Sequence, residues 1–431
     1  MDTKVFKFGG ASMKDAAHIY NVKSILEKYT QNKLLVVVSA MGKTTNALEQ
    51  VFKDFCEKGK EAFDDKMDFI IEMHLKNAEE LGVDVEAIRA DLVKLKNTTL
   101  KTLLEKESPP KDMIYDQIVA LGELFSTKLL SSYLSLTSNK VTWLDVRDVL
   151  KTDDNFQEAL VDFSLTKSNV DEKVEKLFKN FDVIITQGFL GSTSDNLTTT
   201  LGREGSDYTA AIFAYCLEVE ELSIWKDVPG ILTADPRRFE NVQKIDRMSY
   251  KEAIEMTYYG AKVIHPKTIS PIQNKGIKLN VKSFIDPEGE GTIIGPDGLL
   301  NYPPIVVVQD DMILLQIFTK DFSFIAEDHL SIIFSKMKEN RIKMRMMKNS
   351  AVSFTICISN PGQARLEAFK NDLGENFSFD VLNDLQLITV RYFTEQLIDN
   401  LMQNKVVLFE ERMKYTIQLA VRPLLELIEK A

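Results

Sequence analysis

The sequence predicts an α/β protein with a mostly parallel, open sheet covered by helices on both faces, followed by smaller α+β modules. Short apolar segments that fit strands alternate with longer segments of helical periodicity up to about residue 285. Beyond a glycine- and proline-rich stretch at 289–304, the pattern changes to two short units of strand, helix, strand and strand. We therefore expect one domain over residues 1–300 and a second region over 301–431.

The composition of the 431-residue chain is that of an ordinary globular protein, with 44% hydrophobic and 27% charged residues. Its net charge of -11 argues against non-specific binding to nucleic acid or to an anionic membrane. No apolar run approaches the ~20 residues that cross a bilayer, and the N-terminus fits a strand rather than a signal peptide. Three dispersed cysteines indicate free thiols in a reducing compartment, so we expect a cytoplasmic protein without a metal held by Cys or His.

The first strand is predicted over residues 4–8, and Gly9 and Gly10 separate it from a helix predicted over 15–29. A strand, a diglycine and a helix make a turn that can hold phosphate, because backbone N–H groups face the ligand. Lys7 stands two residues before the glycines, where its ammonium group can lie beside a phosphate. An exposed lysine at the end of a strand is the simpler alternative.

The continuous apolar run at 34–42 is typical of a strand buried in a parallel sheet. Ser39 and Thr45 follow near its carboxyl end, where open α/β sheets bind ligands. Capping of the next helix explains the threonine equally well. Helical periodicity then predicts a layer of helices from 46 to 136, in which Glu123 stands beside a glycine and, taken alone, would be a solvated helix residue.

Two more strands are predicted at 140–146 and 181–187, and the stretch at 199–211 follows them with the strongest signal in the chain. Its two glycines allow a tight turn before an Ala-rich helix, whose N-terminus attracts anions. Arg203 can form a fork onto a carboxylate or phosphate. Asp207 falls in the first helical turn, where it can cap the helix or face the ligand.

The remaining part of the first domain contains a strand that runs into a turn at 222–237, with Lys226, Asp227 and Arg237 in the turn. A surface turn without a ligand is the alternative. A helix is predicted from 248 until Gly260 ends it, with Lys262 and Pro266 beyond, and a last strand at 276–284.

Two similar modules are predicted after residue 304, and neither contains a catalytic constellation. The first has strands at 313–318, 342–347 and 352–358 around a helix at 328–340. The second has strands at 385–392, 406–411 and 415–421 around a helix at 394–403. Two such units in succession indicate a repeat.

Seven motifs together closely resemble the aspartate kinases of the amino acid kinase family, in that family's order over about residues 4–285. They are K-F-G-G-A-S, V-V-S-A-M-G-K-T-T-N-A-L, L-G-E, Q-G-F-L-G, T-T-L-G-R-E-G-S-D-Y-T-A-A, W-K-D-V-P-G-I-L-T-A-D-P-R and Y-G-A-K-V-I-H-P. The resemblance implies the amino acid kinase fold and transfer of a phosphoryl group from ATP to L-aspartate, which gives 4-phospho-L-aspartate for lysine, threonine and methionine synthesis. More weakly, the tail resembles that family's tandem ACT domains.

The resemblance also implies roles for residues at the matching positions. Lys7 would stabilise charge on the transferring group, and Asp207 would organise the active-site lysine and the substrate. Arg203 would bind the α-carboxylate of aspartate and Glu123 its ammonium group. Ser39, Thr45 and Ser206 would complete the substrate pocket. Backbone and side chains near ATP would be those of Gly9, Gly10, Ser12, Lys226, Asp227, Leu232, Arg237 and Lys262.

The chemistry fits these residue types, because the β-carboxylate of aspartate, with a free pKa of about 3.9, is already ionised and needs no general base. Catalysis then consists of aligning two anions and neutralising their charge, with Mg²⁺ held mainly by phosphate and water. A sibling kinase acting on glutamate or carbamate would not be expected to keep Glu123, Arg203 and the 199–211 motif together. An inactive amino-acid-sensing protein on the same fold is the main alternative.

The sequence departs from the family pattern at three site positions. Glu204 stands where a second glycine is common, Lys226 replaces a small hydroxyl residue, and Ala11 replaces a threonine. The tail lacks a glycine in the turns at 319–322 and 393–395, where ACT domains that bind lysine or threonine usually carry one. An amino-acid effector is therefore possible but not required, and the modules can serve assembly of a homodimer or a dimer of dimers. A fused homoserine dehydrogenase is not expected, since the sequence ends at Ala431.

Overall fold

A computed structural model describes residues 2–261, 264–299, 301–321 and 323–424. The chain divides into two compact units. The first contains residues 1–231, 244–254 and 262–299, and the second contains residues 232–243, 255–261 and 300–431. Across the described ranges, no helix combines the length and the apolar character needed to cross a membrane. The domain division expected at residue 300 stays a prediction.

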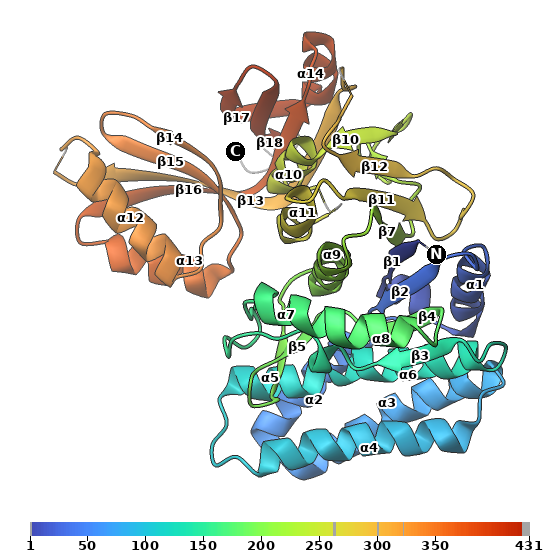
Figure 1. Ribbon diagram of the computed structural model, residues 1–431. Coiled ribbons are helices and arrows are strands. Elements are labelled where there is room, and N and C mark those ends of the chain that lie inside the picture. The colour runs from blue at the N-terminus through green and yellow to red at the C-terminus, as the bar shows by residue number, and fades with distance from the viewer. Residues whose placement is uncertain (1, 262–263, 300, 322, 425–431) are drawn as a thin grey trace. The chain divides into compact units, whose positions relative to one another are not determined.

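The first unit is built on an eight-stranded sheet with the order β10-β12-β11-β7-β1-β2-β4-β3 (Figure 1). All neighbouring strands run parallel except β11 and β12, so the predicted mostly parallel sheet is confirmed. In chain order the strands are β1 (Thr3–Phe8), β2 (Lys33–Val38), β3 (Val141–Leu144), β4 (Val183–Gln187), β7 (Glu221–Lys226), β10 (Arg247–Ser249), β11 (Lys278–Ser283) and β12 (Thr292–Gly295).

Helices cover this sheet, which explains the unbroken apolar run of β2, whose last five residues are all buried. Helix α9 contacts β1, β2 and β7, while α6 contacts β2, β3 and β4. The α-helices assigned wholly to this unit are α1 (Ala16–Glu27), α2 (Thr44–Lys58), α3 (Lys60–Glu80), α4 (Val85–Leu104), α5 (Lys111–Val119), α6 (Leu121–Ser135), α7 (Phe163–Asn169), α8 (Glu175–Phe178), α9 (Gly205–Leu217) and α11 (Pro266–Gln273).

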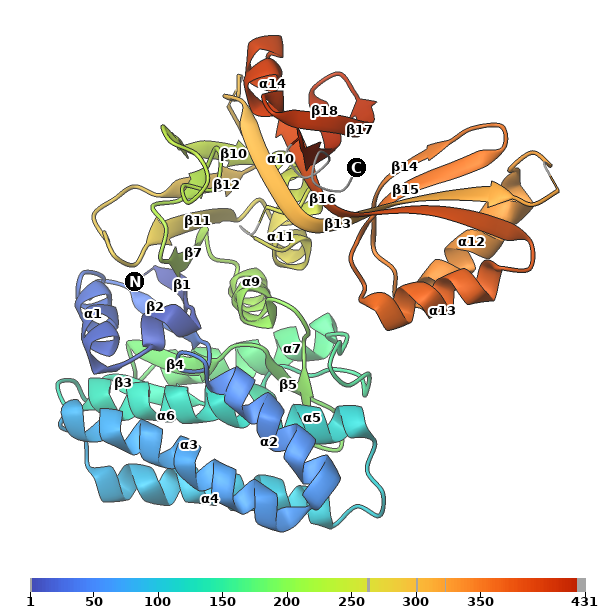
Figure 2. The same cartoon turned by 180° about the vertical axis from the view of Figure 1, so that it is seen from behind.

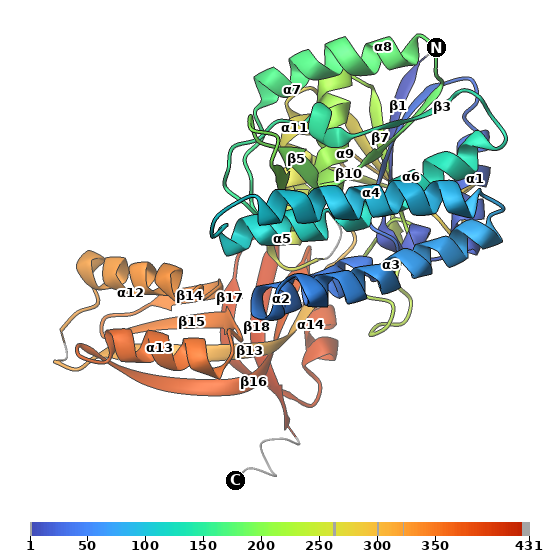
Figure 3. The same cartoon turned by 90° about the horizontal axis from the view of Figure 1, so that it is seen from below.

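The predicted helical layer over 46–136 is confirmed as α2 to α6, with α3 and α4 outermost in the two side views (Figures 1 and 2). Seen from below, α2, α3 and α4 lie in front of the sheet (Figure 3). Gly59 and Gly82 end helices in left-handed backbone conformations, with φ of 77° and 70°, as glycine does most readily.

The sequence interpretation missed several elements of the first unit. Pro266 was read as following a helix, whereas it opens α11, with the side chain of His265 as the cap. Strand β12 falls in the stretch read as a linker and pairs antiparallel with β11. Other short elements that were not predicted are η1 (Gly10–Met13), η2 (Val146–Asp148), α7, η3 (Val170–Val174), α8, β5 (Leu190–Ser192), β6 (Thr198–Thr200) and β9 (Lys244–Ile245), as well as β8 (Ile231–Leu232), whose two residues are divided between the units. Helix α10 (Tyr250–Tyr258) ends before Gly260, as expected.

The second unit contains one antiparallel sheet of six strands with the order β14-β15-β13-β16-β18-β17. Its elements are β13 (Ile305–Thr319), α12 (Glu327–Glu339), β14 (Met344–Asn349), β15 (Ser353–Ser359), α13 (Gln363–Leu373), β16 (Phe377–Arg391), α14 (Glu395–Met402), β17 (Lys405–Arg412) and β18 (Thr416–Pro423). Helices α12 and α13 pack on one half through Ile333, Met337 and Phe369, and α14 packs on the other half through Ile398.

The two modules are therefore not separate, since β13 and β16 run the length of both. These strands pair from Ile305 with Arg391 to Thr319 with Phe377. Both were predicted too short, because Asp311 and Asp384 interrupt their apolar patterns. Each of these aspartates has a left-handed φ, 56° and 61°, at an irregularity that bends a strand without ending it.

Candidate active site

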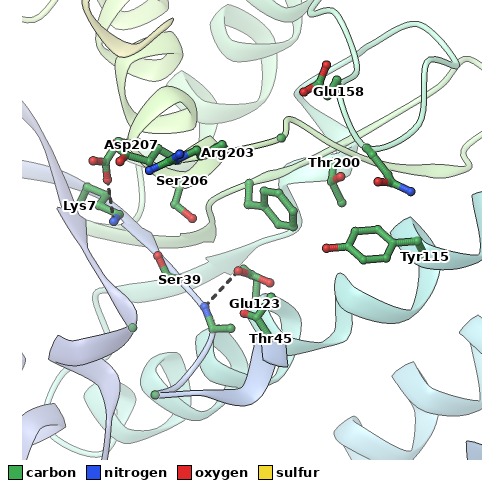
Figure 4. A pocket seen from close by; sticks show the side chains of 18 of the residues that line it. Lys7, Ser39, Thr45, Tyr115, Glu123, Glu158, Thr200, Arg203, Ser206 and Asp207 are labelled. Carbon is green, nitrogen blue, oxygen red and sulfur yellow. Dashed lines mark hydrogen bonds and ion pairs between the residues drawn. The ribbon is translucent and has the colours of Figure 1, made fainter. Parts of the chain in front are cut away.

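A cavity of about 670 Å³ lies in the first unit, where the carboxyl ends of β1, β2 and β7 meet the N-terminus of α9 (Figure 4). This is the edge at which open α/β sheets bind ligands. Its lining residues are Lys7, Gly10, Ser39, Ala40, Gly42, Thr45, Tyr115, Glu123, Gln157, Glu158, Phe189, Thr200, Gly202, Arg203, Glu204, Gly205, Ser206, Asp207 and Lys226.

The turn before α9 depends on its glycines. Gly202 has a φ of 75°, and a Cβ atom on Gly205 would approach the Phe189 ring to 2.7 Å. Glu204, between them, also has a left-handed φ, 55°, which is uncommon for a residue with a Cβ atom. The backbone at Glu204 therefore has a conformation that glycine adopts most readily.

Lys7, Asp207 and Lys226 form a charged cluster at one end of the cavity. The Nζ atom of Lys7 lies 2.6 Å from Oδ1 of Asp207, and the Nζ atom of Lys226 lies 3.4 Å from Oδ2. Asp207 is 3% exposed. Burial by itself would raise the pKa of Asp207, but the two ammonium groups outweigh it and lower this pKa to about 2. One carboxylate thus holds two cations beside the cavity.

Glu123 lies in the first turn of α6 and is 4% exposed. Its Oε1 atom accepts a hydrogen bond from the backbone N–H of Ala40 at 3.2 Å, while Oε2 has no hydrogen-bond partner among the described residues. Gly122 allows this approach, since a Cβ atom there would lie 2.9 Å from Cβ of Ala40. Burial raises the pKa of Glu123 to about 8, more than the Ala40 N–H and the Lys7 charge lower it.

The other predicted substrate residues also line the cavity. Ser39 follows β2, Thr45 lies in the first turn of α2, and Ser206 lies in the first turn of α9. Arg203 is exposed and stands beside Ser206 and Asp207 (Figure 4). The structure thus brings together side chains from 7 to 226, which the sequence could relate only through motifs.

The predicted nucleotide residues divide into three groups. Gly10 and Lys226 line the cavity, and a Cβ atom on Gly10 would clash with the Ala40 carbonyl at 2.8 Å. Gly9, Ser12 and Asp227 belong to the same unit but are not among the lining residues. Leu232 and Arg237 belong to the second unit, and Lys262 lies outside the described residues.

Several lining residues were missed. Phe189 and Thr200 lie within motifs that were recognised, so their glycine-rich and hydroxyl-rich surroundings were a usable signal. Tyr115, Gln157 and Glu158 had none, because they come from a helix and an irregular loop that reach the cavity only through the tertiary fold. In Figure 4, Tyr115, Thr200 and Glu158 lie opposite Lys7 and Asp207.

Among the described residues, no group of three or more His, Cys, Asp and Glu is placed to hold a metal ion. The Asp207 carboxylate is taken up by two lysines.

Comparison with known proteins agrees with this geometry, since a model of the amino acid kinase family matches residues 2–283. The chain belongs to the amino acid kinase family. Within this family, lysine-sensitive aspartokinase 3 of Escherichia coli is 32% identical over 362 residues, which cover 83% of this chain and 78% of that protein. Bifunctional aspartokinase/homoserine dehydrogenase 1 of Arabidopsis thaliana is 29% identical over 387 residues, which cover 86% of this chain and 42% of that longer protein.

Solved structures of family members extend the similarity to nearly the whole chain. Escherichia coli aspartokinase III matches with a TM-score of 0.80 and 25% identity in complexes with lysine and aspartate, and with aspartate and ADP. The matches cover 99% and 100% of this chain and 96% and 98% of those chains.

Proposed function

We propose that the chain is an aspartate kinase, which transfers the γ-phosphoryl group of ATP to the β-carboxylate of L-aspartate and releases ADP and 4-phospho-L-aspartate. The observation that carries the proposal is the single cavity that joins a buried glutamate, Glu123, to the Lys7–Asp207 pair. Aspartate has an ammonium group that can bind Glu123 and a reacting carboxylate that can lie beside the Lys7–Asp207 pair. The similarity to aspartokinases supports the same substrate.

At the substrate end, Glu123 receives the ammonium group of aspartate. Its Oε2 atom is buried without a hydrogen-bond partner among the described residues, and a buried acceptor of this kind gains most from a charged donor. Arg203, at the mouth of the α9 turn, binds the α-carboxylate in a fork. Hydroxyl groups that complete the pocket are those of Ser39, Thr45 and Ser206.

At the phosphoryl end, Lys7 neutralises charge on the transferring group, and Asp207 holds Lys7 in place. Gly10 and the N-terminus of α9 provide N–H groups for phosphate. The acceptor is already an anion, so no general base is needed and catalysis rests on alignment and charge. MgATP is the co-substrate, and the proposed nucleotide contacts are Gly9, Ser12, Lys226, Asp227, Leu232, Arg237 and Lys262.

The proposal for the second unit is a tandem ACT-like region over 301–431, which follows a catalytic domain over 1–300. Two helix-covered modules on one sheet support it. This region either binds an amino-acid effector or serves assembly into a homodimer or a dimer of dimers. Because the Escherichia coli enzyme has been solved in complex with lysine, lysine is the first candidate for the effector. Lysine, threonine and methionine synthesis is the proposed pathway, and the three unpaired cysteines support the cytoplasm.

The test is coupled detection of ADP with aspartate, MgATP and purified full-length protein. Turnover with aspartate but not with glutamate supports the proposal. Lys7→Ala and Asp207→Ala should abolish most of it, whereas Lys4→Ala, on the same strand but outside the cavity lining, should not. An unmodified protein that releases no ADP at any Mg²⁺ concentration would instead be an inactive amino-acid sensor.

A further inference from the structure

Helix α5 carries a buried carboxylate, Asp116, to which no part of the proposed reaction assigns a role. Its side chain is 0% exposed. Oδ2 accepts the backbone N–H of Gln157 at 3.0 Å and that of Thr200 at 2.8 Å. Oδ1 accepts the Thr200 hydroxyl at 2.8 Å. One side chain therefore makes three hydrogen bonds to two segments that are distant in sequence.

Both segments are walls of the cavity, since Gln157 and Thr200 line it. Gln157 has a left-handed φ of 69° and belongs to the loop between Thr152 and Val161, which carries the lining residue Glu158 next to it. The Gln157 carbonyl oxygen lies 3.1 Å from where a Cβ atom on Gly202 would be, so the loop packs against the turn before α9. A displacement of Gln157 would reach the Arg203 side of the cavity.

We infer that Asp116 is a positioning residue that fixes this wall, defined by Gln157, Glu158 and Thr200, in the arrangement that accepts the amino-acid substrate. The inference rests on the proposed function for its substrate. Asp116 does not line the cavity and touches no reactant, so it acts through the backbone N–H groups that it holds. A non-glycine residue in a left-handed conformation persists only where surrounding contacts impose it, and Asp116 supplies such a contact at Gln157.

The charges around Asp116 make this wall sensitive to pH. The acidic and phenolic groups on the neighbouring elements are Asp112 and Tyr115 on α5, Glu49 on α2, Glu123 on α6 and Glu158 in the loop. Lysines stand on the packed helices as well, among them Lys111 on α5, Lys53 and Lys58 on α2, and Lys101 on α4. Within the described part of the chain, no ion pair to Asp116 is recorded. Burial raises the pKa of Asp116 to about 6, although its three hydrogen bonds lower it and Asp112 raises it further. Protonation of Asp116 below this pH weakens its hydrogen bonds to the backbone N–H groups of Gln157 and Thr200.

The test compares Asp116→Ala with Asp112→Ala. Alanine removes both acceptor oxygens at 116, so the N–H groups of Gln157 and Thr200 lose their acceptor. Asparagine is unsuitable, because its amide oxygen can accept both N–H groups while its NH2 group donates to the Thr200 hydroxyl. We expect the KM for aspartate to rise at least tenfold, with kcat within threefold and the KM for ATP within twofold. Asp112, exposed and one turn earlier, accepts only the side-chain N–H of Gln157, and its variant should stay within twofold on all three constants. Equal effects on both substrates, or none, would overturn the inference.

Three further measurements extend the test, of which Thr200→Val does not need the Asp116→Ala variant to fold and hydrogen exchange does not need aspartate to be the substrate. Thr200→Val removes only the hydroxyl bond and should raise the KM for aspartate about threefold. In the unmodified protein this KM should rise more steeply as the pH falls through 6 than protonation of Glu123 alone explains, and this additional steepness should be absent in Asp116→Ala. Hydrogen exchange at the amides of 157 and 200 needs no substrate: we expect at least tenfold faster exchange in Asp116→Ala, and unchanged exchange would refute the positioning role whatever the reaction is.

Discussion

The ammonium group of Lys7 lies 2.6 Å from the carboxylate of Asp207, which the ammonium group of Lys226 reaches from the other side at 3.4 Å. Lys7 and Lys226 come from the neighbouring parallel strands β1 and β7, and Asp207 comes from α9, which packs on both. The pair is therefore fixed by the sheet itself. The carboxylate offsets the repulsion between the two cations and holds both at the same edge of the sheet, where an anionic reactant can meet them.

Asp207→Asn should lower kcat strongly while leaving the fold intact. The amide keeps the size of the side chain but no longer fixes the two lysines, and loss of one preorganised charge contact costs about 10² to 10³ in kcat. Steady-state kinetics with aspartate and MgATP measures this. Asp195→Asn, outside the cavity lining, is the control, and a fall in kcat of less than threefold at position 207 would contradict the proposed role.

The affinity for aspartate should increase with pH up to about 8. The raised pKa of Glu123 keeps it protonated at pH 7 in the free protein, and binding of the ammonium group requires the ionised form. The KM for aspartate should therefore fall as the pH rises from 6.5 to 8.5. Glu123→Gln should remove this dependence and raise the KM about 10- to 10²-fold, since a hydrogen bond between charged groups is worth about 1.5 to 3 kcal/mol.

Glu123 should also make the free energy of unfolding depend on pH. A carboxyl whose folded pKa is raised from 4.5 to about 8 contributes stability that is complete below its unfolded pKa and is lost as the pH rises through the folded pKa. The free energy of unfolding of the unmodified protein should thus decline between pH 5 and 8 relative to Glu123→Gln. Parallel urea titrations at several pH values measure the difference, and a constant difference would argue against the buried acid.

Glu204→Gly should stabilise the protein relative to Glu204→Ala. Both variants remove a carboxylate from an anion-binding cavity and should lower the KM for MgATP, but only glycine suits the φ of 55° at this position. We expect the glycine variant to exceed the alanine variant by about 1 kcal/mol in free energy of unfolding. Equal stabilities would show that the turn relaxes around a side chain.

Lys226→Thr tests a second of the three departures from the family pattern. The ammonium group of Lys226 is one of the two charges that lower the pKa of Asp207. Its removal should therefore raise that pKa. We expect kcat/KM for MgATP to fall about tenfold, within the range of one charged contact, and Lys226→Arg to retain most of it. If threonine increased kcat/KM, Lys226 would be a restraint on Lys7 and Asp207 rather than a contact to the nucleotide.

Much of the first unit could be predicted because its signals are local. Buried parallel strands give unbroken apolar runs such as that of β2, and strand-end glycines such as Gly10 and Gly202 identify the ligand edge before the strands are placed. Every predicted substrate residue lines the cavity, since each belongs to a motif. Ser39 and Arg203 could be assigned to one site without knowing their separation.

The missed features depend on the tertiary fold. Tyr115 looks like any residue of an amphipathic helix, and its place in the cavity follows from how α5 meets β6. Helix α13 carries mostly polar residues and buries only Leu366, Phe369 and Leu373, which makes its periodicity weak. Strand β12 depends on pairing with β11, which its own composition does not specify.

The strands β13 and β16, each fifteen residues long, pass through both halves of the second unit. Neither half can be expressed alone with its part of the sheet intact, because division at Asp311 and Asp384 would interrupt the pairing of both strands. Recombination between related proteins would therefore have to transfer the two halves as one block. A signal received by one half would likewise reach the other along continuous backbone rather than across a linker.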